Sequence, residues 1–348
     1  MNKTTIAAMR LPLVAQRILV SAEPECRSVL AASPHTDTEL LASLCRDKTP
    51  GIRRFAYLRT DDVELLREEL SRQTAGLCTP YAARNPLAPA DLLVHTLGST
   101  QVQAALGAYL NPSTPEDARR RLTPARATEL TDVGGSNHDR VVRAHELVVN
   151  NPWMLETPDA WDGNVRRALA GLPQATAEHL ELIKKAGRSG GSAVRRHPVL
   201  RAEFSERTPQ EWGTHELARI GGAAADLMVL HRPDFDAQAA EIILGFGEKP
   251  EPEPHIIGRI LNRLGAEALS VEVLPSMLRC SGTRYNAASW VAPIMGFLTF
   301  DMTLQWPGLR ESFTRLGDDR PAWETFLSLI GTSWHGTPLE AAEASFTL

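Results

Sequence analysis

The chain of 348 residues lacks the features of several protein classes. It has no uninterrupted apolar run of about 18 residues, the length that a membrane-spanning helix needs. Arg10 and Arg17 interrupt the apolar start before it becomes a signal-peptide core. The four cysteines stand alone without a C-x-x-C pair, so neither a zinc cluster nor a disulfide framework is indicated. We therefore expect a cytoplasmic protein that does not enter a membrane.

Motifs of catalysis and metal binding are missing as well. The ten histidines include no H-E-x-x-H pair. Residues 187–191 match the letters of G-x-S-x-G, but a helical pattern precedes them where a nucleophile elbow needs a strand. Residues 245–250 lack the Walker spacing of a phosphate-binding loop. We expect no catalytic residue, no cofactor and no metal ion.

Charge is distributed unevenly along the chain. Residues 1–200 contain 25 Lys and Arg against 22 Asp and Glu, whereas residues 201–348 contain 12 against 20. Wrapping of nucleic acid along the whole molecule needs a continuous basic surface, which the acidic second part does not offer. The acidity instead favours a partner protein with a basic surface. The Ala- and Arg-rich composition suggests a bacterial or phage source.

What the sequence does contain is a turn element that recurs every 26 residues. Its copies begin at Ser33, Arg59, Asn85 and Asn111. Apolar or small residues recur around it in three slots: Leu40, Leu66, Leu92 and Ala118; Leu44, Leu70, Thr96 and Leu122; Ala56, Ala82 and Ala108. Slots four residues apart share one helix face, so each unit is predicted to hold two short helices. One of these helices is predicted to begin at a capping box of Thr36 and Glu39.

A fixed period of this length is typical of stacked helical units. The segments that carry the pattern include Ala83-Arg84-Asn85-Pro86-Leu87-Ala88-Pro89, Ile52-Arg53-Arg54-Phe55-Ala56 and Val165-Arg166-Arg167-Ala168-Leu169. They resemble variant leucine-rich and HEAT-like repeats over roughly residues 25–185. The resemblance implies an all-α, right-handed α-solenoid, and proteins of this type mostly have no enzymatic activity.

Three segments are predicted along the chain. Residues 1–186 form the repeat solenoid, and residues 187–254 contain degenerate repeats and a linker that ends in alternating prolines. Residues 255–348 form a helical C-terminal cap with four of the seven tryptophans. These tryptophans form either the core of the cap or an aromatic interaction patch. We select Trp306, Trp323 and Trp334 as candidate partner-binding residues.

Two further clusters are candidate sites. The first is basic and could bind an anion or form a solvated loop: Lys184, Lys185, Arg188, Arg195, Arg196 and Arg201, with His197. The second is Trp153 with Trp161-Asp162 and Arg166-Arg167, which resembles the aromatic-plus-aspartate arrangement of HEAT-like alkylpurine DNA glycosylases. The resemblance carries over only Trp161, Asp162 and Arg166. The sequence thus predicts a non-enzymatic protein-binding scaffold, adaptor or inhibitor. The alternative is a HEAT-like DNA-binding protein or glycosylase.

Overall fold

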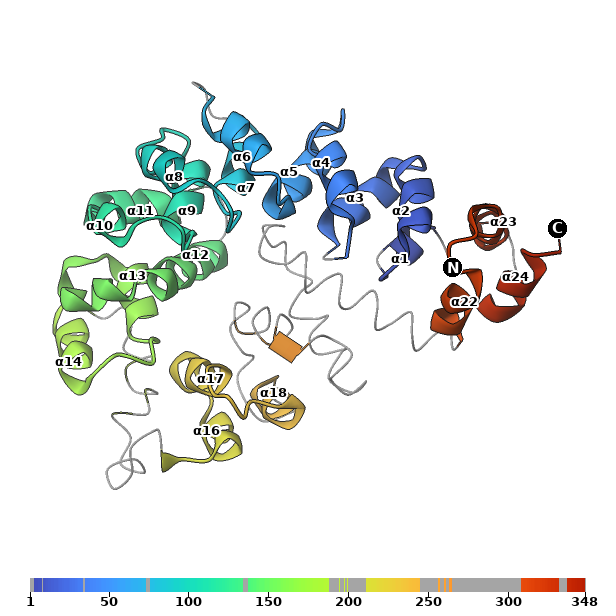
Figure 1. Ribbon diagram of the computed structural model, residues 1–348. Helices are drawn as coiled ribbons and strands as arrows, with labels where there is room; N and C mark the ends of the chain where they lie inside the picture. Colours follow the sequence, from blue (N-terminus) through green and yellow to red (C-terminus); the bar gives the residue numbers. More distant parts are fainter. Residues whose placement is uncertain are drawn as a thin grey trace. The chain divides into compact units, whose positions relative to one another are not determined.

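The computed structural model describes residues 3–7, 9–33, 35–72, 76–133, 137–187, 211–244, 308–331 and 337–347, with positions 194, 197, 199, 256, 260, 263 and 264. Every regular element in these ranges is a helix, which confirms the all-α class (Figure 1). The chain divides into two compact units, one of Met1–Pro89 with Trp290–Leu348 and the other of Ala90–Ser289. The first of these units groups the C-terminal helices with the N-terminal helices, whereas the sequence predicted three consecutive segments.

The first unit begins with seven short helices. They are α1 (Lys3–Ala7), α2 (Leu13–Val20), α3 (Pro24–Ala32), α4 (Thr38–Leu44), α5 (Pro50–Arg59), α6 (Val63–Leu70) and α7 (Thr79–Ala82). Helix α3 packs against α5, and α5 packs against α7. Ala56 and Ala82 have no exposed surface, as predicted for a slot where neighbouring helices approach closely. Leu44 and Leu70, from the second predicted slot, are also buried.

The start of α4 differs from the predicted capping box. Asp37 is the residue before the helix, and its carboxylate accepts hydrogen bonds from the backbone N–H groups of Glu39 and Leu40. Thr36 instead donates its hydroxyl to the carbonyl of Leu30 at 2.6 Å, at the end of α3. The prediction was wrong because an aspartate one position later makes the same N-terminal cap.

The strict period of 26 residues also misplaces some core leucines. Leu66 is fully buried as predicted, but Leu40 and Leu92 are only half-buried. Leu41 and Leu93, one position later, are the buried residues, at 5% and 0% exposure. The spacing between equivalent core leucines is therefore 25 and then 27 residues, since the turns between the helices differ in length.

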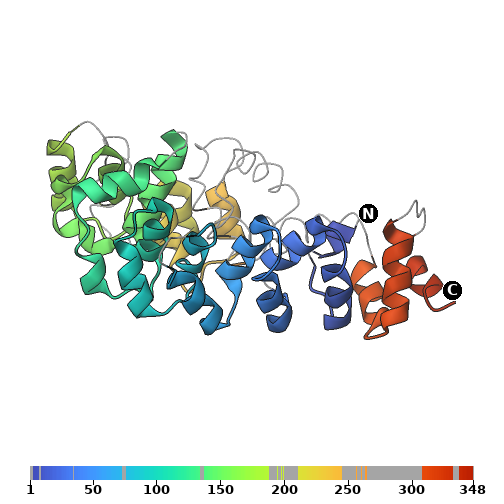
Figure 2. The same cartoon turned by 90° about the horizontal axis from the view of Figure 1, so that it is seen from above.

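The C-terminal helices of the first unit are α22 (Leu309–Leu316), α23 (Arg320–Gly331) and α24 (Pro338–Ala344). Helix α22 packs against α24, and α23 packs against α1 and α2, so the end of the chain lies beside its beginning (Figures 1 and 2). Trp323 and Phe326 have no exposed surface and contact Phe313, with ring centroids 5.2–6.2 Å apart. These aromatic rings form the core of the three helices.

The second unit contains the remaining described helices. They are α8 (Ala90–Leu97), α9 (Val102–Leu110), α10 (Glu116–Arg119), α11 (Pro124–Asp132), α12 (Asn137–Asn150), η1 (Pro152–Glu156), η2 (Pro158–Ala160), α13 (Gly163–Leu169), α14 (Ala177–Lys185), α16 (Thr214–Ile220), α17 (Ala223–Leu230) and α18 (Ala237–Leu244). Helix α8 packs on α9, α9 on α12, and α12 on α13. Helix α16 packs against both α17 and α18. Gly221 and Gly222, with φ of 68° and 98°, make the tight turn between α16 and α17.

Buried polar side chains fix the turns between the helices. In the first unit, Asn85 donates its amide to the carbonyls of Tyr57 and Thr60 at 2.9 and 2.8 Å, and its own carbonyl accepts from the N–H of Leu87. In the copy of the turn element that begins at Arg59, the hydroxyl of Thr60 accepts from the N–H of Asp62 at 3.2 Å. Each such side chain forms hydrogen bonds with backbone N–H or C=O groups that have no partner within their own helix.

Candidate functional site

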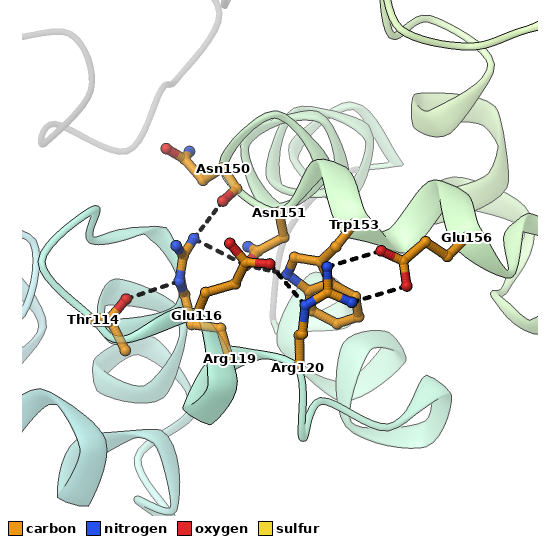
Figure 3. A network of polar contacts seen from close by, with 8 residues as sticks. All are labelled: Thr114, Glu116, Arg119, Arg120, Asn150, Asn151, Trp153 and Glu156. Carbon is orange, nitrogen blue, oxygen red and sulfur yellow. Dashed lines mark hydrogen bonds and ion pairs between the residues drawn. The ribbon is translucent and has the colours of Figure 1, made fainter.

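The site is built where α10 meets the turn after α12, in the second unit (Figure 3). Arg119, the last residue of α10, donates to the carbonyl of Thr114 at 3.0 Å and to that of Asn150. It also donates to the side-chain oxygen of Asn151 at 3.2 Å. Burial lowers the pKa of the Arg119 guanidinium, and these three oxygens offset part of the cost of removing it from water.

Arg120 lies beside it and is exposed. Its guanidinium binds both oxygens of the Glu156 carboxylate at 2.8 Å, and its Nε binds Glu116 at 2.7 Å (Figure 3). These bonds raise the pKa of Arg120 and lower the pKa of Glu156. The three side chains are 40–62% exposed, so water and salt screen the ion pairs. The pairs therefore orient the Arg120 side chain and add little to the free energy of unfolding.

The charged pair holds an aromatic ring in place. The Arg120 guanidinium carbon lies 5.5 Å from the centre of the Trp153 ring, which is half-buried. The indole N–H of Trp153 donates to Asn151 at 3.3 Å, and the ring of Trp161 meets it edge-on at 6.0 Å. Trp153 therefore presents a ring of fixed orientation, with its polar edge already bonded and with opposite charges beside it.

The residues of the glycosylase resemblance have structural roles. Trp161 is 5% exposed and donates its indole N–H to the carbonyl of Met154 at 2.9 Å. Asp162 caps α13 by accepting from the N–H of Val165. Arg166 donates to the carbonyl of Ala186, which joins the end of α14 to α13. No feature of these contacts favours a pocket for a base, so the resemblance gains no support from them.

The predicted anion cluster is described only in part. Lys184 and Lys185 lie in the last turn of α14, where Lys184 pairs with Glu181 at 3.2 Å and both lysines are exposed. His197 turns inward instead: it is fully buried, and its Nε2 lies 3.0 Å from the carbonyl oxygen of Leu172. Burial lowers the pKa of His197, so this residue is a neutral turn-fixing group and not part of a basic surface. Arg188, Arg195, Arg196 and Arg201 lie outside the described residues.

The candidate partner-binding tryptophans need a correction. Trp323 has no exposed surface, and its indole N–H donates to the carbonyl of Gly317 at 2.9 Å. A partner cannot contact this ring without unfolding the core, so of the two interpretations the core is right for Trp323. Trp306 and Trp334 lie outside the described residues.

Sequence reasoning noticed Trp153 but missed the residues that orient it. The adjacent arginines 119 and 120 and the distant Glu156 carry no local signal of their meeting, because 36 residues separate Arg120 from its bidentate partner. The usable signal was Asn151-Pro152, which repeats the turn of the earlier units. Only the packing of α12 shows that this turn returns to α10.

In the described ranges, no three His, Cys, Asp or Glu side chains are grouped so that they could hold a metal ion. Likewise, none of the helices described is long and apolar enough to cross a membrane. No protein-family model, no curated protein and no solved structure matches the chain.

Proposed function

We propose that this chain is a non-catalytic helical-repeat scaffold that binds another protein, with the surface around Trp153 as a contact point. The observation that carries the proposal is the fixed, half-buried Trp153 ring beside the Glu116–Arg120–Glu156 charges. The proposal includes the fold: the helices around Trp153 belong to a right-handed α-solenoid with repeats of about 26 residues. The resemblance to HEAT-like repeats supports that arrangement.

The physical reason is the energetics of protein interfaces. Tryptophan and arginine dominate the residues whose truncation weakens binding most. An anchor that is already ordered in the free protein loses little side-chain entropy when a partner arrives. Trp153 meets this condition, since Asn151, Trp161 and Arg120 hold three sides of the indole.

The partner in this proposal also has a basic surface. Residues 201–348 carry eight more acidic than basic side chains, and complementary charge speeds association at low salt. The cytoplasm remains the proposed compartment, with adaptor or inhibitor as the role. DNA binding or base excision stays the second reading of the sequence, and no contact described above favours it.

Co-purification from the native cell, with variants, tests the proposal. Trp153→Ala is expected to lower the yield of a stoichiometric partner about ten-fold or more, because an anchor typically contributes at least about 2 kcal/mol. Val94→Ala, at a 37% exposed apolar residue of the same unit, is the matched control and should retain the partner. Circular dichroism and thermal unfolding establish that both variants fold. Full partner recovery with folded Trp153→Ala would contradict the proposed surface, and turnover of a small molecule by partner-free protein would contradict the scaffold role.

A further inference from the structure

Helix α5, in the first unit, carries three arginines and no acidic residue: its sequence is PGIRRFAYLR. Arg53 is satisfied by the backbone, because its guanidinium donates to the carbonyls of Asp47 and Lys48 at 2.7 and 3.3 Å. Both acceptors are backbone carbonyls, so these two bonds do not neutralise the charge of Arg53. The other two arginines of α5, Arg54 and Arg59, form no ion pair with a described residue.

Arg54 has a polar atom that the protein does not satisfy. Its guanidinium lies over the ring of Tyr81, 5.9 Å from the ring centre, and Tyr81 belongs to the neighbouring helix α7. The Nε atom of Arg54 is buried and has no hydrogen-bond partner in the described part of the chain. The terminal nitrogens of this guanidinium are not buried in this way, so they are the atoms that an acceptor from outside can reach.

Arg59 repeats the situation at the end of the same helix. It is half-buried, and burial alone lowers the pKa of its guanidinium. Within the described ranges no carboxylate forms an ion pair with it, although Asp61 and Asp62 follow closely in sequence. The carboxylate of Asp62 is used elsewhere, since it caps α6 by accepting from Glu64 and Leu65. The C-terminus of a helix favours a cation but supplies no full counter-charge.

Apolar side chains accompany these cations. Phe55 and Leu58 are half-buried, and so is Tyr81 on α7. Leu58 is four residues after Arg54, and Arg59 is four residues after Phe55, so cationic and apolar side chains alternate on neighbouring positions of the helix surface. Helix α7 packs directly against α5, which places Tyr81 at the same surface. We call Arg54, Phe55, Leu58, Arg59 and Tyr81 the α5–α7 face.

We propose that the α5–α7 face binds an acidic segment of a partner protein, whose carboxylates pair with Arg54 and Arg59 while its apolar side chains pack on Phe55, Leu58 and Tyr81. Carboxylates match the planar donor geometry of the guanidinium group, whose terminal nitrogens they can bind in pairs. This inference rests on the proposed function as a protein-binding scaffold and names a second surface for it.

Nucleic acid is the less suitable anion for this face. Tight phosphate binding normally uses several cations in a row, whereas the α5–α7 face as described has two, Arg54 and Arg59. The exposed carboxylates of Glu64 and Glu68 on α6 belong to the same unit, and the whole chain has a net charge of −5. A long polyanion would meet these charges, but a short acidic peptide segment would not need to extend over them.

Fluorescence anisotropy with the full chain provides the test. The probe is a short fluorescein-labelled peptide in which Asp and Glu alternate with Leu and Phe. The same peptide with Lys in place of the acidic residues, and a labelled single-stranded oligonucleotide, complete the set. Arg54→Gln with Arg59→Gln is the test variant. Arg46→Gln with Arg121→Gln is the matched control, because it removes the same charge from two exposed positions elsewhere.

The acidic peptide is expected to bind the unmodified chain and to bind the test variant about ten-fold or more weakly, with the control variant unchanged. Arg54→Lys should also weaken binding, since it keeps the charge but loses the planar donors, and it guards against loss of fold in the double variant. No peptide binding at low salt, equal weakening by both double variants, or tighter binding of the oligonucleotide at these arginines would overturn the inference. None of these results affects the Trp153 experiment, so the two proposals fail separately.

Discussion

Asn85 in the first unit and Asn151 in the second fix their turns in the same way over different chain lengths. Asn85 reaches carbonyls that lie 28 and 25 residues back, whereas Asn151 reaches the carbonyl of Tyr109, 42 residues back. The longer interval contains the additional helix α11, and Arg119 completes the second turn by binding Asn150 and Asn151. The comparison teaches that the two turns share their hydrogen bonds and not the number of residues that these bonds span.

His197 extends this lesson to another residue type. Its Nε2 lies 3.0 Å from the carbonyl of Leu172, 25 residues back, and its Nδ1 accepts from the N–H of Val199 at 3.3 Å. Asn85 makes the same two kinds of contact with an amide. An imidazole can therefore replace the amide, but it adds a group that titrates.

The largest expected effect concerns the core of the first unit. Leu66→Ala in the first unit should lower the free energy of unfolding by about 2–5 kcal/mol, because Leu66 has no exposed surface and the change leaves a cavity. Leu87→Ala, at a 51% exposed leucine, should cost less than about 0.5 kcal/mol. Urea unfolding followed by circular dichroism measures both. Equal values for the two variants would show that the packing around Leu66 is incorrectly described.

The next largest effect is expected from acid, which should destabilise the second unit more than the first. His145 in α12 is buried, and desolvation together with the charge of Arg167 lowers its pKa from 6.5 to about 4. Between these pH values the unfolded chain binds a proton that the folded chain does not, so stability falls as pH falls through this window. The loss should reach about 2 kcal/mol between pH 7 and pH 5.

His145→Gln checks this pH dependence, because it removes the titrating group. The variant should show a flatter dependence of unfolding free energy on pH, with the weaker contribution of His197 remaining. Hydrogen exchange, corrected for intrinsic rates, should show the loss of protection in α12 before α3 and α5. An unchanged slope in the variant would assign the acid sensitivity to other groups.

Replacement of the turn amides comes third. Asn85→Leu leaves the carbonyls of Tyr57 and Thr60 without this donor and should cost about 1–3 kcal/mol. Asn151→Leu should cost more within the same range, since Arg119 and Trp153 also lose their acceptor. Asn164→Ala, at a half-buried asparagine of α13, is the control with a small effect. If Asn164→Ala destabilises as much as the turn variants, the turns have no special role.

The smallest effect is expected at the exposed ion pair. Glu156→Gln should leave the melting temperature unchanged within error, because the pair with Arg120 is solvent-screened. Arg119→Met, at the residue before Arg120, should lower the melting temperature clearly, because the carbonyls of Thr114 and Asn150 lose a charged donor. A melting temperature that falls more for Glu156→Gln than for Arg119→Met would reverse the assignment of orienting and stabilising roles.

The sequence by itself determined the local features. Helix type, the paired short helices, the small residues at Ala56 and Ala82, and the turns before proline all follow from contacts within a few residues. About the site, the sequence placed Trp153 in the glycosylase-like cluster but did not show which residues orient its ring. Its errors at Thr36, Leu40 and Leu92 are shifts of one residue, which a fixed period cannot resolve when turn lengths vary.

The tertiary structure alone decided which side chains face inward and which distant segments meet. It buried Trp323 and His197, placed α23 against α1 and α2, and brought Glu156 to Arg120. Each of these outcomes depends on groups many residues apart, whose interaction free energy exists only once the helices have packed. A local pattern identifies residues that are able to bind or to pack, and the neighbours supplied by folding determine which of the two they do.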